Sequence, residues 1–400
     1  MKKRFIAILM CTFVLGLTAC SGTGTPNTEG TKTETNTKIE TENETDNSEI
    51  TNNEETKDNT IRVTDQNGME AILPSNPTRL VTTALPLPSI YALTGAPIDY
   101  LVGVHPGSTS AIENSVMSAM YPQLSNVANN FIDGTDINIE ELLKLEPDVV
   151  LYWAEYLEQY EAMKNAGINA VGVKTQANGD VLATLESWLE IMGEIFGTTG
   201  NVEEVISYGR KVESEIVEKT ANLSDDDKQK VLYLYNHSAD DISVSGSGFY
   251  GQYWIETAGG INVAEQLNGA TSVNMEQIYE WNPDVIIVST FTETMPEDLY
   301  NNTIDGQDWL PIDAVKNGKV YKEPLGVYRW FPPSGDAPLM LKWMAQTLYP
   351  QLFTYDMEDE IEDYYERFYN YDLEDEQIEG ILEANPQAAK GANFGGGATK

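Results

Sequence analysis

Cysteine, histidine and basic residues are all scarce in this 400-residue chain. It has two Cys, two His, and 24 Lys and Arg against 63 Asp and Glu, which gives a net charge of −39. Nucleic-acid binding needs a basic face, so this balance argues against a nucleic-acid partner. Both cysteines, Cys11 and Cys20, lie near the N-terminus. The remainder of the chain can therefore form no disulfide bond within itself.

Catalytic motifs are also missing. The sequence contains no Gly-x-Ser-x-Gly nucleophile elbow and no glycine-rich phosphate-binding loop, and it has no thiol after Cys20. We therefore predict that the protein is not an enzyme and has no intrinsic cofactor. A cluster of His, Asp and Ser assembled by the fold stays open as an alternative.

The N-terminus carries an apolar run at 5–17 that follows a basic start at 1–4. The run is too short to span a membrane and is typical of a secretory signal. It ends in Leu-Thr-Ala-Cys20, which resembles the lipobox of bacterial lipoproteins. The resemblance implies that 1–19 is a signal peptide and that Cys20 is acylated. Lipid chains such as palmitate would then anchor the protein on the extracytoplasmic face of the cell membrane.

Composition divides the rest of the chain. Residues 20–59 have almost no large apolar side chains, which predicts a disordered acidic tether. The predicted folded parts are an N-terminal α/β lobe at 60–178, a connecting backbone helix at 179–222, a C-terminal α/β lobe at 223–355, and an acidic C-terminal helix with a disordered tail at 356–400.

One sequence unit occurs twice, at 137–153 and at 273–289, 136 positions apart. Each copy begins with an Asn that caps a helix (Asn138, Asn274), continues with apolar residues at helical spacing, and reaches Pro-Asp before an apolar strand. A period this long is too great for a solenoid and indicates two related lobes. Proteins made of two like lobes usually bind a ligand between them.

Predicted strands and helices alternate in both halves, which predicts parallel α/β sheets. Residues 180–219 differ, because they are rich in helix formers and lack a convincing strand, although Gly197 and Gly200 interrupt the pattern. The predicted fold is α/β, with two Rossmann-like lobes joined by a long rigid α-helix. A stiff connection of this kind predicts only a small closure of the lobes.

The lipobox, the paired units and the connecting helix together resemble the solute-binding proteins of bacterial ABC transporters. The match is to the group for iron-siderophores, haem and cobalamin, and it covers roughly 60–355. The segments Thr-Ala-Gly-Gly-Ile-Asn at 257–262 and Tyr-Arg-Trp-Phe-Pro-Pro-Ser at 328–334 also look like that group.

The resemblance implies a monomer that captures a metal chelate and delivers it to an ABC permease. Ferric siderophore is the first choice of ligand, and haem, cobalamin, a nickel or cobalt chelate, or molybdate are alternatives. A surface sensor or adhesion protein and a chelatase-like enzyme are the alternatives of another class.

Ligands of open parallel sheets bind beyond the carboxyl ends of the strands. Residues that follow the predicted strands are mostly aromatic and carry few charges, which suits a flat or bulky chelate, and an arginine among them could pair with an oxyanion. The predicted ligand-binding residues are His105, Ser108, Tyr152, Trp153, His237, Tyr250, Tyr328, Arg329 and Trp330.

Two of these positions carry more specific hypotheses. His105 and His237 each follow a predicted strand, one in each lobe, and could complete the coordination of a metal, although structural histidines are common. Ser108 lies in Gly-Ser-Thr-Ser at 107–110, which could cradle an oxyanion or simply cap a helix.

Glu140 and Glu276 occupy matching positions in the two repeat units. The family resemblance implies that one surface glutamate on each lobe pairs with arginines of the permease, and the motif assigns these two. An acid in the first turn of a helix is also favoured by the helix dipole alone. We expect both at the end of the sheets opposite the ligand cleft.

Overall fold

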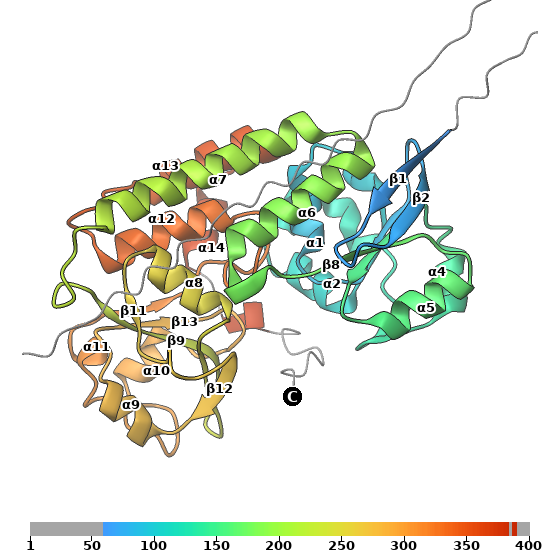
Figure 1. Cartoon of the computed structure of the whole chain (residues 1–400). Coiled ribbons are helices and arrows are strands. Elements are labelled where there is room, and N and C mark those ends of the chain that lie inside the picture. The colour runs from blue at the N-terminus through green and yellow to red at the C-terminus, as the bar shows by residue number, and fades with distance from the viewer. Residues whose placement is uncertain (1–58, 384–385, 390–400) are drawn as a thin grey trace, which may run out of the picture. The chain divides into compact units, whose positions relative to one another are not determined.

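The structure, a computed structural model, describes residues 59–383 and 386–389 (Figure 1). Cys20, the predicted signal peptide and nearly all of the predicted tether lie outside the described residues, as does the end of the chain from 390. No helix in the described ranges is long and apolar enough to cross a membrane.

The first lobe is built on a four-stranded sheet in the order β4-β3-β7-β8, and every pair in it is parallel. Its strands are β3 (Leu80–Thr82), β4 (Leu101–Val104), β7 (Val149–Trp153) and β8 (Ala170–Val173). Their helices are α1 (Leu87–Leu93), α2 (Pro106–Glu113), α4 (Ile139–Lys144) and α5 (Leu157–Asn165). Two small antiparallel hairpins accompany the sheet: β1 (Thr60–Thr64) with β2 (Glu70–Pro74), and β5 (Ile132–Asp133) with β6 (Asp136–Ile137).

The second lobe has a six-stranded sheet that is mixed, not wholly parallel. Its main order is β12-β10-β9-β13-β14, with β11 also paired to β9. β10 runs antiparallel to both β9 and β12, because a short turn folds the chain straight back after β9. The strands are β9 (Lys230–His237), β10 (Ile242–Ser245), β11 (Ile261–Asn262), β12 (Ala270–Val273), β13 (Val285–Val288) and β14 (Val320–Lys322). The helices around it are α8 (Tyr250–Thr257), α9 (Met275–Trp281), α10 (Pro296–Tyr300) and α11 (Asp313–Lys316).

The aspartate of the repeated Pro-Asp makes equivalent backbone hydrogen bonds in both lobes. The carboxylate of Asp148 accepts hydrogen bonds from the backbone N–H groups of Thr78 and Arg79, just before β3. Asp284 accepts from the N–H of Lys230, the first residue of β9. Each aspartate therefore joins the start of its own strand to the start of the neighbouring strand.

Two helices, not one, connect the lobes. α6 (Val181–Phe196) ends at Gly197, whose left-handed φ of 68° suits glycine, and α7 (Thr199–Thr220) begins two residues later. The prediction of one continuous helix is corrected at this break. The apolar stripe at Trp188 and Met192 is buried in the main core cluster, as core packing requires.

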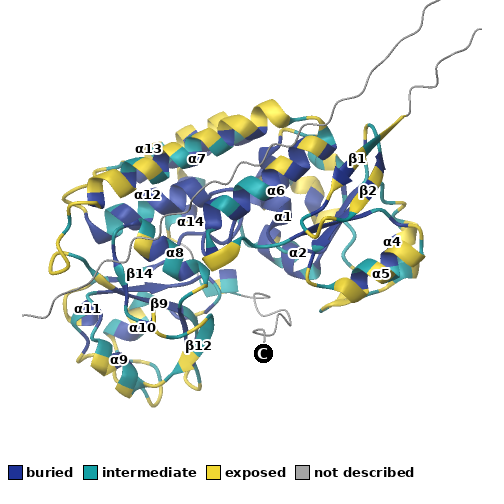
Figure 2. Cartoon of the chain, in the orientation of Figure 1, coloured by how far each residue is buried: buried dark blue, intermediate teal, exposed yellow. Residues whose placement is uncertain are grey.

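The C-terminal part of the described chain is packed into the fold. α12 (Ala337–Leu348) contacts both α7 and α13 (Met357–Tyr364), and the exposed sides of α7 and α13 face outward (Figures 1 and 2). A π-helical turn, η4 (Tyr365–Tyr369), and α14 (Asp375–Leu382) follow, and η5 (Pro386–Ala389) is a last short turn. Where the sequence predicted one acidic helix, the structure therefore has several short elements.

A buried carboxylate fixes this part to the second lobe. Asp336, which is fully buried, accepts hydrogen bonds from the hydroxyls of Tyr365 and Tyr369, from the indole N–H of Trp330, and from the backbone N–H of Val327. These donors come from η4 and from the loop that follows β14. The C-terminal elements therefore help to position that loop.

Candidate functional site

His105 lies directly after β4, as the sequence predicted, and His237 is the last residue of β9, but both imidazoles are used by the protein. His105 is 4% exposed and caps α2; its Nδ1 accepts from the N–H of Gly107 at 2.9 Å, and its Nε2 lies 3.0 Å from the carbonyl of Gly134. Because Nδ1 accepts, Nε2 carries the proton and donates to that carbonyl. Burial lowers the pKa of His105, which keeps the ring neutral.

His237 is held in a similar way. Its Nδ1 lies 2.9 Å from the hydroxyl of Thr294 and its Nε2 lies 2.7 Å from the side-chain oxygen of Gln307. Burial also lowers the pKa of His237. Among the described residues no cluster of three His, Cys, Asp or Glu side chains is arranged to hold a metal ion. The geometry therefore does not favour the hypothesis that these histidines ligate a metal, because each ring would first have to break a hydrogen bond.

Three further candidates point into the lobes. Ser108 is buried and its hydroxyl donates to the carbonyl of Leu85, while the N-cap of α2 is His105, so the oxyanion cradle is not formed by this side chain. Tyr152 is buried and stacks on Tyr160 with ring centroids 6.0 Å apart. Trp330 is buried with its N–H on Asp336. All three side chains are buried and are hydrogen-bonded or stacked within the protein, and their role in ligand binding stays a prediction.

Trp153 keeps one side accessible. Its ring is half-buried and meets Trp188 of α6 edge to face, with centroids 5.5 Å apart. Trp153 is the last residue of β7, at the carboxyl end of the first lobe's sheet. It is therefore placed where it would report a ligand through its fluorescence.

Arg329 is the most unusual charge of the second lobe. It is 1% exposed, and its guanidinium lies 5.0 Å from the ring centre of Phe291 and 5.7 Å from that of Tyr328. Nε donates to the carbonyl of Thr290 at 3.4 Å, and Nη2 donates to the carbonyl of Ala388 in η5 at 2.5 Å. In the described part of the chain no carboxylate forms an ion pair with it. Its partners are backbone carbonyls and neutral aromatic side chains, including a side-chain hydrogen bond with Tyr328, and a buried cation without an anionic partner is a strong attractor for an anion.

A group of aromatic rings, which we name the aromatic cluster, adjoins this arginine. Its rings lie within van der Waals reach of one another, with neighbouring centroids 5.1 to 5.5 Å apart. All but one are only partly buried. The members are Tyr235, Phe249, Tyr250, Phe291 and Phe331.

The sequence had indicated only Tyr250 among these rings. Tyr235 closes the strand that the sequence predicted and Phe291 follows the next repeat strand, so the strand-end rule could have found both. Phe331 directly follows the predicted Arg329 and Trp330, so the same rule could have included it, whereas Phe249 carries no such signal.

Each lobe has a cavity at the carboxyl ends of its strands. In the second lobe a cavity of about 600 Å³ is lined by the end of β9 with His237, by residues after β13 such as Phe291 and Thr292, and by Ala389 of η5. In the first lobe a cavity of about 600 Å³ lies between the loop after β7, with Glu155 and the start of α5, and the β5–β6 hairpin. Ligand space is therefore present where the strand-end rule places it.

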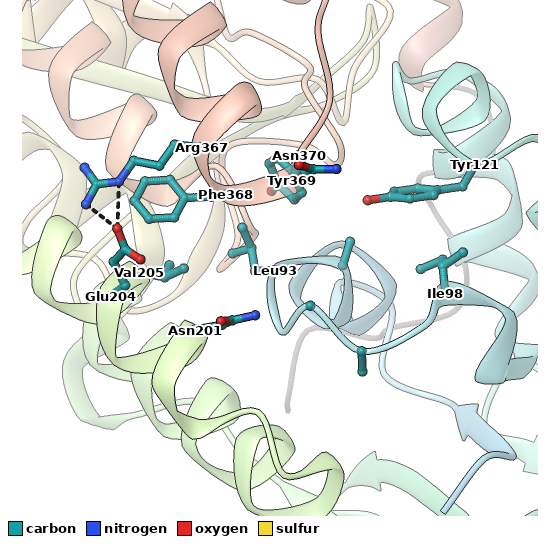
Figure 3. Close-up of a pocket in the computed structure, with 13 residues that line it drawn as sticks. Leu93, Ile98, Tyr121, Asn201, Glu204, Val205, Arg367, Phe368, Tyr369 and Asn370 are labelled. Carbon is teal, nitrogen blue, oxygen red and sulfur yellow. Dashed lines mark hydrogen bonds and ion pairs between the residues drawn. The ribbon is translucent and has the colours of Figure 1, made fainter.

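A third cavity of about 310 Å³ is built from different elements (Figure 3). It lies between the end of α1, the start of α7 and η4, with Leu93, Asn201 and Phe368 among its walls. The guanidinium of Arg367 is paired with Glu204 through contacts of 2.9 and 2.6 Å. The charge of Arg367 is therefore already neutralised by Glu204. This cavity attracts an anion less strongly than the surroundings of Arg329 do.

Glu140 and Glu276 are both exposed, in the first turns of α4 and α9. In the second lobe, Ile242 of β10 pairs with Val273, the last residue of β12, and also with His237, the last residue of β9. Because α9 follows Val273, it begins at the carboxyl end of β9. α4 likewise follows the β5–β6 hairpin, which touches His105 through Gly134. The expectation that these glutamates lie opposite the cleft is wrong, because a helix that precedes a parallel strand runs back along it and starts at that strand's carboxyl end.

Comparison with known proteins gives a consistent result. A family profile described as periplasmic binding protein matches residues 89–324. The molybdate-binding protein MolA of Haemophilus influenzae is 29% identical over 268 residues, which cover 62% of this chain and 73% of that protein. The iron(3+)-hydroxamate-binding protein FhuD of Bacillus subtilis is 23% identical over 240 residues, which cover 57% of this chain and 71% of that protein.

Solved structures extend the similarity to most of the chain. A periplasmic solute binding protein from Veillonella parvula has a TM-score of 0.75 and 34% identity, covering 83% of this chain and all of that one. MolA bound to molybdate has a TM-score of 0.66 and 26% identity, covering 78% of this chain and 99% of that one.

Proposed function

Because this chain belongs to the periplasmic binding protein family, we propose that it captures a metal-containing anion or anionic metal chelate outside the cytoplasm and delivers it to an ABC permease. The observation that carries this proposal is Arg329, a buried guanidinium without a carboxylate partner among the described residues, set beside the aromatic cluster. Capture is noncovalent and needs no catalytic group.

A ferric siderophore is the ligand that this chemistry suits best. The exposed sides of the aromatic rings offer broad, rigid contact area to a bulky chelate, and the guanidinium offers charge to its carboxylate, catecholate or hydroxamate oxygens. The similarity to FhuD, whose name gives an iron(3+)-hydroxamate ligand, supports this choice. Haem, cobalamin and nickel or cobalt chelates share the same requirement for ring contact.

Molybdate is the second candidate, and the similarity to MolA favours it. A small tetrahedral oxyanion uses hydrogen-bond donors and positive charge, with little need for ring faces. The two candidates therefore differ in how they depend on the aromatic cluster. Replacement of Phe291 by Leu weakens binding of a bulky chelate and leaves binding of molybdate nearly unchanged.

The experiment is a fluorescence titration of the purified chain with ferric desferrioxamine, a ferric catecholate and sodium molybdate. Arg329→Gln removes the charge, and a charged hydrogen bond contributes about 1.5–3 kcal/mol, so affinity for the true ligand falls about 10- to 100-fold. Arg62→Gln is the matched control, since Arg62 is an exposed arginine on β1. If no probe binds, or if both variants bind alike, the proposed site is wrong.

The same proposal includes a membrane anchor and a docking surface. Acylation of Cys20 would hold the protein at the membrane, and Glu140 and Glu276 would pair with arginines of the permease, as the family resemblance implies. Both glutamates are exposed, and both lie at the carboxyl ends of the sheets. Docking would then face the ligand directly.

A further inference from the structure

A second buried carboxylate, Glu323, lies directly after β14. It is fully buried and accepts hydrogen bonds from the hydroxyl of Tyr233 at 3.0 Å, from the N–H and hydroxyl of Thr290 at 3.3 Å each, and from the N–H of Phe331 at 2.5 Å. These donors belong to three separate parts of the lobe: β9, the loop after β13, and the loop after β14. One side chain therefore connects three segments that the sequence separates widely.

The same three segments carry the proposed ligand site. Phe331 is a member of the aromatic cluster and lies two residues after Arg329. Thr290 precedes Phe291, and its carbonyl accepts from Nε of Arg329. The ring of Tyr233 packs on Phe331 with centroids 4.8 Å apart. Each partner of Glu323 therefore belongs to the aromatic cluster, packs on one of its rings, or is hydrogen-bonded to the guanidinium of Arg329.

We propose that Glu323 is a positioning residue of the ligand site, which holds Arg329 and the aromatic cluster in register without touching the ligand. This inference rests on the proposed function of the site. Four donors converge on the two carboxylate oxygens, and none of these donors has a second hydrogen-bond acceptor among the described residues. Loss of the carboxylate therefore frees the loops after β13 and β14 to move apart.

The charges around Glu323 give this role a measurable pH dependence. Burial raises the pKa of Glu323 to about 7, although hydrogen bonds from Tyr233, Phe331 and Thr290 and the charge of Lys322 lower it. The titratable or charged groups that act on it are Tyr233 on β9, Lys322 beside it, and Tyr328 in the following loop. Lys322 donates to the carbonyls of Ser289, Thr292 and Thr294, and burial lowers its pKa to about 8.

The sign of the pH dependence follows from the raised pKa. An opening that exposes Glu323 to water returns its pKa to the ordinary value of 4.5, so the exposed state binds the proton less tightly than the closed state. Opening of the two loops is therefore hardest at low pH and becomes easier as the pH rises from about 5 to about 7. Without the carboxyl group this dependence disappears.

The test uses the full chain and needs no ligand in its first part. Hydrogen exchange of peptides that cover 289–292 and 326–333 is followed from pH 5 to pH 8, with correction for the intrinsic pH dependence of exchange. In the wild type the opening equilibrium rises at least tenfold over this range. In Glu323→Gln both peptides exchange at least tenfold faster at pH 5, and the dependence on pH is flat.

Two milder variants keep the inference testable if Glu323→Gln does not fold. Tyr233→Phe and Thr290→Val each remove a hydroxyl donor but leave the carboxyl group in place. Each gives a smaller increase in exchange than Glu323→Gln and retains the pH dependence. Glu297→Gln, a change on α10, serves as the surface control and alters neither peptide.

The second part measures affinity for ferric desferrioxamine and molybdate. Glu323→Gln lowers the affinity for whichever probe binds about tenfold. If Arg329→Gln weakens binding while Glu323→Gln changes neither exchange nor affinity, the positioning role is refuted and the proposed function stands. If exchange responds as expected but no probe binds, the proposed function fails and the structural role of Glu323 stands.

Discussion

Removal of the last seventeen residues, 384–400, is expected to raise ligand affinity. The carbonyl of Ala388 accepts a 2.5 Å hydrogen bond from Nη2 of Arg329, and the Ala388 side chain packs against Leu325. A ligand oxygen that pairs with the same nitrogen must displace this carbonyl. The C-terminal segment therefore competes with the ligand within the chain itself.

The magnitude follows from the contacts that are lost. A hydrogen bond from a charged donor contributes about 1.5–3 kcal/mol, and burial of one methyl group adds about 0.8 kcal/mol. If the ligand no longer has to break the hydrogen bond between Arg329 and Ala388, truncation raises its affinity about 10- to 100-fold, since 1.4 kcal/mol corresponds to about a factor of ten. Without ligand, the folded state loses about 2–4 kcal/mol, because the hydrogen bond from Arg329 and the contact with Leu325 both go while α14 remains.

The assay is the fluorescence titration with the same three probes, applied to a chain that ends at Glu383. A chain that ends at Ala389 is the matched control, because it keeps the contact with Arg329 and loses only the residues beyond it. We expect the control to bind as the full chain does. Equal affinities for all three chains would refute the reasoning, and a weaker affinity for the chain that ends at Glu383 would show that this segment assists binding.

Three other outcomes are expected. Glu140→Ala with Glu276→Ala leaves probe affinity intact and abolishes uptake in cells, whereas the control pair on the same helices, Glu141→Ala with Glu280→Ala, transports normally. Asp336→Ala leaves four buried donors unpaired and lowers the free energy of unfolding by about 3–5 kcal/mol, measured by urea denaturation; a loss below about 1 kcal/mol would contradict the network. The raised pKa of Glu323 stabilises the fold below pH 4.5, and this contribution, on the order of 3 kcal/mol, is lost as the pH rises to about 7. Between pH 5 and pH 8 the midpoint of urea denaturation falls more in the wild type than in Glu323→Gln. An equal fall in both proteins would exclude this contribution of Glu323.

Local patterns were sufficient for the outline of the fold. Asn138 and Asn274 cap α4 and α9, with their side chains accepting from the N–H groups of Glu141 and Gln277, as the repeat predicted. Alternation of strand and helix predicted the parallel sheet of the first lobe. The antiparallel β10 escaped prediction, because a short polar stretch after β9 reads equally well as a loop to a helix.

The site was only partly predictable, because partners far away in the sequence decide what a side chain does. His105 follows β4 and His237 ends β9, yet three of their four ring nitrogens are used by residues 29, 57 and 70 positions away. Arg329 stays a predicted cleft residue, and its contacts with Phe291 and Ala388 come from separate elements. No local pattern marks such long-range neighbours.

The end of the sheets at which Glu140 and Glu276 lie changes what docking would accomplish. A helix that packs beside a parallel strand and precedes it must start at the carboxyl end of that strand, so the first turns of α4 and α9 lie at the same ends as the two lobe cavities. A permease that binds both glutamates would therefore cover the region where the ligand is held. Separation of the two glutamates by the permease would then draw the lobes apart at that end, and the ligand would leave toward the membrane without crossing the protein.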